Sequence, residues 1–274
     1  MDNQHAMEAR PDVEALRLAA GELARTGGTL ARRFLGKVRA TRKPDNSPVT
    51  PADTAVQEAI LAILAERFPD HAILVEEEVA DPSRHAHIAR AEYCWVIDPI
   101  DGTRNFARGM PVYCTSVAVL HRGQPIAGAI HDATQDVVYS ASRGGGTFRG
   151  NARVRLADRP IDADTTIAIS SIRKSPIPTS VRSWLDQYLF RNIGSLCLHM
   201  VWVAAGLTDA AFSLESKIWD IAAGALLIEE SGGVVTDHAG DSLWPADLAN
   251  YRGDDVPMLA GTPTMHRRLL DSLR

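Results

Sequence analysis

The fold of this chain is organised around the stretch Trp95-Val96-Ile97-Asp98-Pro99-Ile100-Asp101-Gly102-Thr103. It begins inside an apolar, aromatic and β-branched run, residues 93–97, which predicts a buried strand. Asp98 follows where the run stops, and we expect the strand to end there because Pro99 cannot continue a central strand. A glycine then permits a sharp turn after Asp101. Two carboxylates are therefore expected where a strand opens into a loop.

The pair Asp98 and Asp101 indicates a bound cation. At about 4 Å, two carboxylates repel each other by roughly 4 kcal/mol at an effective dielectric of about 20, so a fold that keeps both ionised needs a counter-charge. Oxygen ligands without a nearby histidine or cysteine suit a hard cation such as Mg²⁺. The alternative is an ordinary Asp-Pro turn that Asp101 and Gly102 close, because short motifs alone are weak evidence.

Composition limits the classes of protein to which the chain can belong. Its 274 residues allow one large or two modest domains, and 45% apolar with 23% charged residues is typical of a soluble globular protein. A net charge of −5 without a basic tract makes nucleic acid an unexpected partner. Cys94, Cys114 and Cys197 lie far apart, which predicts neither a disulfide framework nor a zinc site. No membrane span or signal peptide is recognisable, so we expect a cytoplasmic protein with no membrane partner.

Two helices are predicted ahead of the central stretch. A helix over residues 12–34 has Asp12 as its expected N-cap, and Gly27-Gly28 is expected to weaken its middle. A second helix starts after Thr50, with a proline at its first position and Asp53 three residues beyond the cap.

The acidic run Glu76-Glu77-Glu78 follows a short strand expected at residues 72–75. One interpretation is a solvated acidic loop. The other is that one glutamate lies at a strand end and faces the Asp98 turn. We favour the shared site, because the order of strand followed by acid is the same at Ile97-Asp98.

The remainder of the chain changes character near residue 155. Segments 114–120, 125–130 and 137–141 predict an antiparallel meander. The run Gly144-Gly145-Gly146 predicts a hairpin turn, because it lacks the residues that follow glycines in a phosphate loop and opens no helix. Strands and helices then alternate, which is typical of an α/β unit. Its expected strands are 165–170, 190–193, 210–214, 233–236 and 258–260, and its expected helices are 179–189, 195–205, 221–231 and one from residue 263.

We therefore predict an α/β fold of two domains, an α+β domain over residues 1–155 and an α/β domain over residues 156–274. Asp220 precedes the apolar helix of the second domain, where an aspartate is most often an N-cap. Gly194-Ser195 also precedes an apolar helix, first as a cap and second as an anion site.

Four motifs in order resemble the inositol monophosphatase superfamily of magnesium-dependent, lithium-sensitive phosphatases. They are Ser47 to Asp53, Glu76-Glu77, Asp98 to Thr103 continued by Asn105-Phe106, and Trp219-Asp220 followed by Glu229 to Gly233. The segment from Gly194-Ser195 to Asp209 is also similar, so the resemblance runs from about residue 12 to the end of the chain.

The resemblance implies a layered αβαβα sandwich of the sugar-phosphatase type and a metal-assisted mechanism. Two or three Mg²⁺ ions would neutralise a phosphate ester, lower the pKa of a water and stabilise the leaving alkoxide. The implied metal ligands are Glu76, Asp98, the Ile100 carbonyl, Asp101 and Asp220. The implied catalytic residues are Thr103 with Asp53 behind it, which orient and help to deprotonate the water, and Glu76, which helps to hold it. The resemblance implies that the backbone N–H groups of Gly102 and Thr103 bind the phosphate, and Asp220 is a further candidate for substrate binding. Ser195 is a candidate through the anion site at its helix start. Lys217 is either a cation that attracts a second phosphate or carboxylate, or a solvated loop lysine.

Departures from the family pattern concern the substrate. Inositol-preferring members carry a glutamate seven residues before the Trp-Asp aspartate, where this chain has Ser213, and Glu215 is out of register. Val75 stands where a glycine is frequent, and Arg104 where threonine or lysine is frequent. We therefore expect magnesium-dependent hydrolysis of a small phosphate monoester without assigning inositol phosphate. Histidinol-phosphatase, fructose-bisphosphatase and 3′-phosphoadenosine 5′-phosphate phosphatase activities are alternatives, and a non-catalytic binding protein ranks below them. The resemblance also implies a homodimer.

Overall fold

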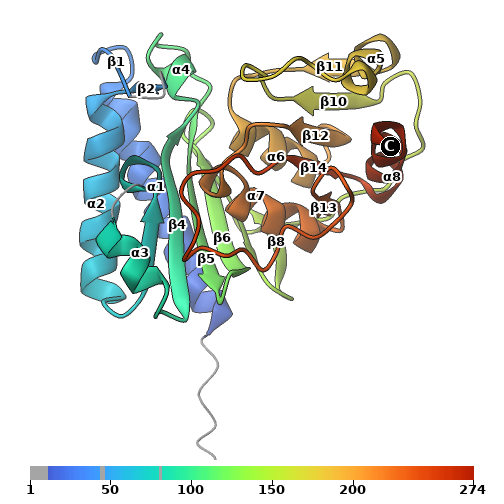
Figure 1. Ribbon diagram of the computed structural model, residues 1–274. Helices are drawn as coiled ribbons and strands as arrows, with labels where there is room; N and C mark the ends of the chain where they lie inside the picture. The colour runs from blue at the N-terminus through green and yellow to red at the C-terminus, as the bar shows by residue number, and fades with distance from the viewer. Residues whose placement is uncertain (1–11, 44–46, 80–81) are drawn as a thin grey trace, which may run out of the picture.

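Helices and sheets alternate in five layers in the computed structural model, which describes residues 12–43, 47–79 and 82–274 (Figure 1). Helices α1 (Val13–Phe34) and α2 (Pro51–Arg67) cover one face of a seven-stranded sheet. Helices α6 (Leu196–Ala204) and α7 (Ile218–Ser231) lie between that sheet and a five-stranded sheet, whose far face α5 and α8 cover. The predicted layered αβαβα fold is confirmed.

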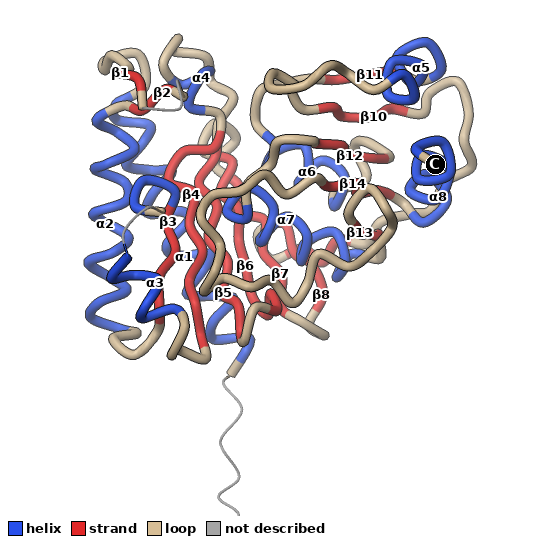
Figure 2. Tube along the Cα trace, viewed as in Figure 1, coloured by secondary structure: helices blue, strands red, loops and turns tan. Residues whose placement is uncertain are grey.

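The seven-stranded sheet has the order β3-β4-β5-β6-β7-β8-β9, and only the β3–β4 pair is parallel. Figure 2 shows strands of this sheet lying beside one another. Its strands are β3 (Ala72–Val75), β4 (Tyr93–Asp101), β5 (Cys114–His121), β6 (Gln124–Asp132), β7 (Val137–Ser142), β8 (Gly146–Arg149) and β9 (Ala152–Val154). The predicted meander and hairpin turn are both confirmed, since β5, β6, β7 and β8 pair antiparallel in sequence order.

The five-stranded sheet has the order β11-β10-β12-β14-β13 and is mixed, with β14 antiparallel to both neighbours. Its strands are β10 (Thr166–Ile169), β11 (Leu189–Arg191), β12 (Ala210–Ser213), β13 (Val234–Thr236) and β14 (Met258–Gly261). The outer helices are α5 (Thr179–Gln187) and α8 (Pro263–Leu273), and short elements are β1 (Thr41–Arg42), β2 (Pro48–Val49), η1 (Glu76–Glu78), α3 (Pro82–Ile88) and α4 (Thr103–Phe106). The sheets separate between β9 and β10, near the proposed boundary at residue 155, and the division into two domains stays a prediction.

The glycines in the middle of α1 are required by the packing of this helix against the sheet. A Cβ on Gly28 would lie 2.2 Å from Nδ1 of His131, and one on Gly27 would lie 2.8 Å from Cγ2 of Thr115. The missing side chains allow α1 to approach the sheet closely. Helix α1 runs unbroken through both glycines, and the expectation that Gly27-Gly28 weakens its middle stays a prediction.

Strand β4 does not stop at Asp98 as expected, but continues through Pro99 to Asp101. Its register with β5 shifts between Asp98 and Asp101, which is a β-bulge. On the other side, β3 has already ended at Val75. No ladder hydrogen bond is therefore demanded from the nitrogen of Pro99, and the expectation that proline ends the strand is wrong for this physical reason.

No helix among the described residues is both long and apolar enough to cross a membrane.

Candidate active site

The parallel register of β3 and β4 brings the first two acids together. Val75 is the register partner of Ile97, so Glu76 and Asp98 each follow the last paired residue at the same edge of the sheet. The carboxyl ends of neighbouring parallel strands meet at such an edge, where α/β sheets place their ligands. The interpretation of Glu76-Glu77-Glu78 as partly a strand-end site is consistent with this arrangement.

The bulge and the turn after it bring Asp101 to the same place. Gly102 has φ of 92°, and a Cβ on it would lie 2.8 Å from the carbonyl oxygen of Val112. A side chain therefore fits neither the backbone conformation nor the space. The turn opens α4, and the hydroxyl of Thr103 donates to the carbonyl of Ile100 at 2.8 Å.

The fourth acid arrives from the other half of the chain on the helix between the sheets. Helix α7 begins at Ile218 rather than at residue 221, so Asp220 lies in its first turn and is not its N-cap. Its Oδ2 accepts the backbone N–H of Lys217 at 2.7 Å. Carboxylate oxygens of Asp98, Asp101 and Asp220 lie within 4.8 Å of one another. The N-terminus of α7 thus adds a carboxylate to the two from β4.

The cluster is buried and electrostatically unfavourable by itself. Asp98 is 2% exposed, and its Oδ1 has no hydrogen-bond partner among the described residues. Burial raises the pKa of Asp98 well above its usual value, and the charges of Glu76, Asp101 and Asp220 raise it further. Burial also raises the pKa values of Asp101 and Asp220, with Glu76 adding to both effects. A cation in the cluster would relieve this repulsion.

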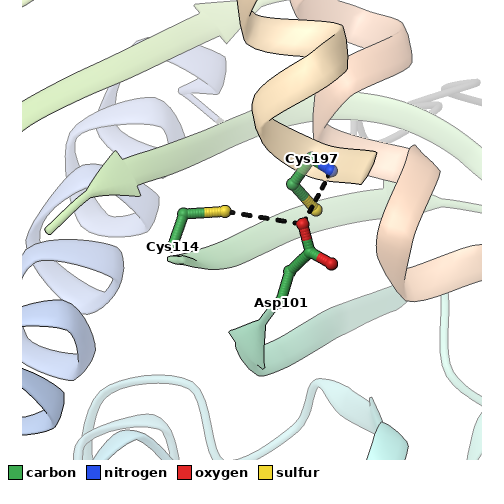
Figure 3. Close-up of side chains that lie close together, drawn as sticks. All are labelled: Asp101, Cys114 and Cys197. Carbon is green, nitrogen blue, oxygen red and sulfur yellow. Dashed lines mark hydrogen bonds between the residues drawn. The ribbon is translucent and has the colours of Figure 1, made fainter. Parts of the chain in front are cut away.

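Asp101 is held in place by the start of α6. Its Oδ2 accepts hydrogen bonds from the hydroxyl of Ser195 and, at 2.8 Å, from the backbone N–H of Cys197. Ser195 is also the N-cap of α6, because its hydroxyl accepts the N–H of Leu198 at 3.2 Å. Figure 3 shows the thiols of Cys114 and Cys197 flanking the same carboxylate. The cap interpretation of Ser195 is confirmed, and its contact with substrate stays a prediction.

Lys43 supplies a counter-charge that the sequence analysis missed. Its ammonium lies 2.6 Å from Oε1 of Glu76 and 2.7 Å from Oε1 of Glu77. Burial, with a further contribution from the neighbouring charge of Glu76, raises the pKa of Glu77 to about 7. Lys37, Arg39, Arg42 and Lys43 lie close together in the sequence, which carries no signal for which of these cations turns inward.

The remaining predicted residues make local contacts. Oδ2 of Asp53 accepts the N–H of Thr50 at 2.8 Å and its hydroxyl at 2.6 Å, which completes a capping box. Thr103 donates to Ile100 rather than to Asp53. The ammonium of Lys217 pairs with Asp255 at 2.9 Å and also donates to the carbonyl of Gly253. Catalytic and substrate-binding roles for these residues stay predictions.

Two cavities meet the acid cluster. One, of about 860 Å³, is lined by residues that include Ser195, His199, Ser213 and Asp220. The other, of about 890 Å³, is lined by residues that include Lys43, Glu76, Lys217 and Asp220. Arginines are prominent in these walls, a feature without a sequence motif: Arg42, Arg104, Arg108 and Arg173 line the first cavity, and Arg104, Arg173 and Arg252 the second. An acidic centre with a basic rim suits an anionic substrate that meets bound cations.

The sequence matches the model of the inositol monophosphatase family over residues 9–272. The chain belongs to this family. Among its relatives, an inositol-1-monophosphatase of Mesorhizobium japonicum is 31% identical over 91% of this chain and 92% of its own length. A Nus factor SuhB of Pasteurella multocida is 33% identical over 82% of this chain and 85% of its own length.

Solved structures of family members have the same fold as this chain. The extragenic suppressor protein suhB of Bartonella henselae has a TM-score of 0.80 and 26% identity, covering 95% of this chain and 98% of the other. An inositol monophosphatase of Anabaena has a TM-score of 0.79 and 27% identity, covering 96% of each chain. The resemblance inferred from the four motifs is therefore confirmed.

The acid cluster fits a hard divalent cation, as expected for a family of generally metal-dependent enzymes. Asp98, Asp101 and Asp220 offer oxygen ligands from two elements, and Oδ1 of Asp98 is buried without a partner. Oxygen ligands at close range are what Mg²⁺ takes in proteins. A buried carboxylate oxygen left unpaired is costly, which a bound ion would correct.

Proposed function

We propose that this chain hydrolyses a small phosphate monoester with the help of two or three Mg²⁺ ions. The observation that supports this most strongly is the convergence of Asp98, Asp101 and Asp220 from the two halves of the chain, with Oδ1 of Asp98 buried and unpaired. Family membership supports a phosphatase by itself. The identity of the ion is our inference from the oxygen ligands.

The proposed ligands are Glu76, Asp98, the Ile100 carbonyl, Asp101 and Asp220. When bound, the ions would neutralise the ester, activate a water and stabilise the leaving group. A phosphate ester carries up to about two negative charges, so it would otherwise be repelled by these carboxylates. The acids would therefore hold the cations against which the phosphate of the substrate would bind.

The chain's own groups would position the reacting water and the phosphate. Glu76, whose Oε1 lies 2.6 Å from the ammonium of Lys43, would accept a hydrogen bond from the water. Thr103 already orients its hydroxyl at the turn. Burial raises the pKa of Asp53 and the charge of Glu76 adds to this effect, which would favour proton acceptance by Asp53. We propose the backbone N–H groups of Gly102 and Thr103 as phosphate donors, because a turn that exposes successive N–H groups binds anions.

The basic rim favours a substrate with a second anionic group. Arg173 and Arg104 line both cavities, while Ser213 replaces the glutamate expected of inositol-preferring members. A guanidinium binds phosphate or carboxylate with two parallel hydrogen bonds. Fructose bisphosphate and 3′-phosphoadenosine 5′-phosphate satisfy this description, whereas histidinol phosphate and inositol phosphate have one phosphate only.

The direct test is hydrolysis of p-nitrophenyl phosphate across a Mg²⁺ titration after chelation. Asp220→Asn should lose the metal-dependent rate, and Asp186→Asn, an exposed residue of α5, should keep it. Thermal unfolding should shift upward with Mg²⁺ in the wild type and in Asp186→Asn but not in Asp220→Asn, because a ligand at about 100 times its Kd stabilises by ~2.7 kcal/mol. Hydrolysis that survives chelation, or an active Asp220→Asn protein, would overturn the proposal.

A second candidate comes from the relatives named Nus factor SuhB. It is a binding role that does not require hydrolysis, and it is favoured if the chain binds Mg²⁺ yet hydrolyses none of a panel of phosphorylated metabolites. The homodimer, the cytoplasmic location and the absence of nucleic acid as a partner remain predictions.

A further inference from the structure

A second potential metal site lies directly against the acid cluster. Cys114 is the first residue of β5 and the register partner of Asp101 on β4. Cys197 lies in the first turn of α6, in the helical layer that faces this edge. The two sulfurs and a carboxylate oxygen of Asp101 lie within 4.8 Å of one another. Figure 3 shows the three side chains pointing toward one another. Three elements thus converge on one point with two thiols and one oxygen.

The distances between the donor atoms of this group are close to the distances between the ligands of a bound metal ion. Sγ of Cys114 lies 3.8 Å from Oδ2 of Asp101 and 3.8 Å from the hydroxyl of Ser195. Sγ of Cys197 lies 3.0 Å from the carbonyl oxygen of Asp220. Tetrahedral zinc, with bonds of about 2.3 Å to sulfur and about 2.1 Å to oxygen, places its ligands roughly 3.6–3.8 Å apart. Small side-chain shifts would complete this geometry.

The chemistry of this donor set differs from that of the acid cluster. Thiolates prefer soft or borderline cations such as Zn²⁺, whereas Mg²⁺ takes oxygen ligands alone. Both cysteines are fully buried and free, and they are not needed by the proposed hydrolysis. The Ser195 hydroxyl and the carbonyl of Asp220 offer further oxygens close by.

We propose that Cys114, Cys197 and Asp101 form an inhibitory site for a thiophilic divalent cation of the zinc type. The ion would share Asp101 with the magnesium site and draw this carboxylate toward the two sulfurs. On binding, each thiol releases its proton to solvent and the aqueous ion loses waters, with no change of oxidation state. The ion would enter through the cavity that Ser195 and Asp220 line. The proposed binding of this ion does not depend on the proposed function. The proposed inhibition rests on the proposed hydrolysis.

The binding is tested with Co²⁺ on the full chain, after reduction with a phosphine and desalting. Wild-type protein should show the near-ultraviolet absorption of thiolate-to-cobalt charge transfer, saturating near one equivalent. Zn²⁺ should abolish it, whereas excess Mg²⁺ should not. Cobalt bound to oxygen ligands alone gives no such absorption, so this readout is independent of phosphatase activity.

The matched variants exchange one cysteine at a time. Cys114→Ser and Cys197→Ser should each lose at least about 80% of the charge-transfer absorption, and Cys94→Ser should retain it. Cys94 is also fully enclosed, but its thiol faces the backbone carbonyl of Trp95 on β4. Cys114→Ala and Cys197→Ala, with folding confirmed by circular dichroism, separate a lost ligand from a misfolded chain.

Inhibition supplies the second readout. With Mg²⁺ in excess, the Zn²⁺ concentration that halves the rate should rise at least tenfold in the variants at positions 114 and 197, and not in Cys94→Ser. Absent charge transfer in the wild type, or its persistence in folded variants at both positions, would overturn the site. Charge transfer in a protein without magnesium-dependent hydrolysis would retain the site and refute the proposed function.

Discussion

Glu76 and Asp98 lie one residue beyond the register pair of Val75 and Ile97, where the pairing between the parallel neighbouring strands β3 and β4 ends. This relationship is the geometric origin of the acid cluster. The charge of Glu76 is the largest neighbouring contribution to the raised pKa of Asp98, after burial. Two acids that are 22 positions apart in the sequence are thus coupled because two strands share a register.

Asp98→Asn should lower the rate of magnesium-dependent hydrolysis and raise the stability of the metal-free protein. The amide binds a cation poorly, so we expect kcat/KM for magnesium-dependent hydrolysis to fall at least ~100-fold. In metal-free buffer at about pH 8, the free energy of unfolding should rise by the order of 1 kcal/mol, because one charge leaves a crowded buried cluster. Hydrolysis assays and urea unfolding measure the two effects. Unchanged magnesium-dependent hydrolysis, or a lower free energy of unfolding in the folded variant, would contradict this account.

Gly102→Ala should lower the free energy of unfolding more than Gly144→Ala does. Gly102 and Gly144 both have positive φ, but a Cβ would lie 2.8 Å from the Val112 carbonyl at the first and has open space at the second. Gly144→Ala should cost about 1 kcal/mol of unfolding free energy. Gly102→Ala should cost about 2 kcal/mol more, with a lower rate of hydrolysis. Equal losses in both variants, measured by urea unfolding, would exclude the steric explanation.

His199 should make the protein less stable in mild acid. Its Nε2 accepts the N–H of Ile193 at 3.1 Å, so the ring is neutral, and burial lowers its pKa from 6.5 to about 4. Between these values the unfolded chain binds the proton and the folded chain does not, so stability falls as pH falls through this range. The contribution lost at pH 5 is about 2 kcal/mol.

His199→Gln can still accept the Ile193 N–H but does not titrate. The difference in unfolding free energy between wild type and variant should therefore shrink by about 2 kcal/mol from pH 7 to pH 5. Other buried histidines, such as His131 and His266, titrate in both proteins and cancel in this comparison. Urea titrations at several pH values provide the measurement, and a constant difference would refute the assignment.

Arg173→Ala should change selectivity rather than the chemical step. The backbone N–H of Arg173 donates to Glu215 at 2.8 Å, which fixes the residue at the edge of both cavities. KM for a bisphosphate should rise about tenfold, equivalent to ~1.4 kcal/mol, while p-nitrophenyl phosphate is unaffected. Arg182→Ala, on the exposed surface of α5, is the control. An equal rise in KM for both substrates would contradict the role in specificity.

The sequence by itself determined the elements and the identity of the acids. The capping residues Asp12 and Thr50 and the apolar run before Asp98 are local signals, and each forms the element it predicts. Such signals depend on residues within one or two turns, so they can be read without the fold. The family motifs work in the same way, because they are short and contiguous.

Only the tertiary structure decided which groups meet. Asp220 reaches Asp98 because α7 lies between two sheets, Lys43 turns toward Glu76, and Cys114 and Cys197 converge on Asp101. The sequence also predicted that β4 would end at Pro99, whereas the strand continues because the neighbouring β3 has already ended. Register and packing join residues that are distant along the chain, and no local pattern encodes such contacts.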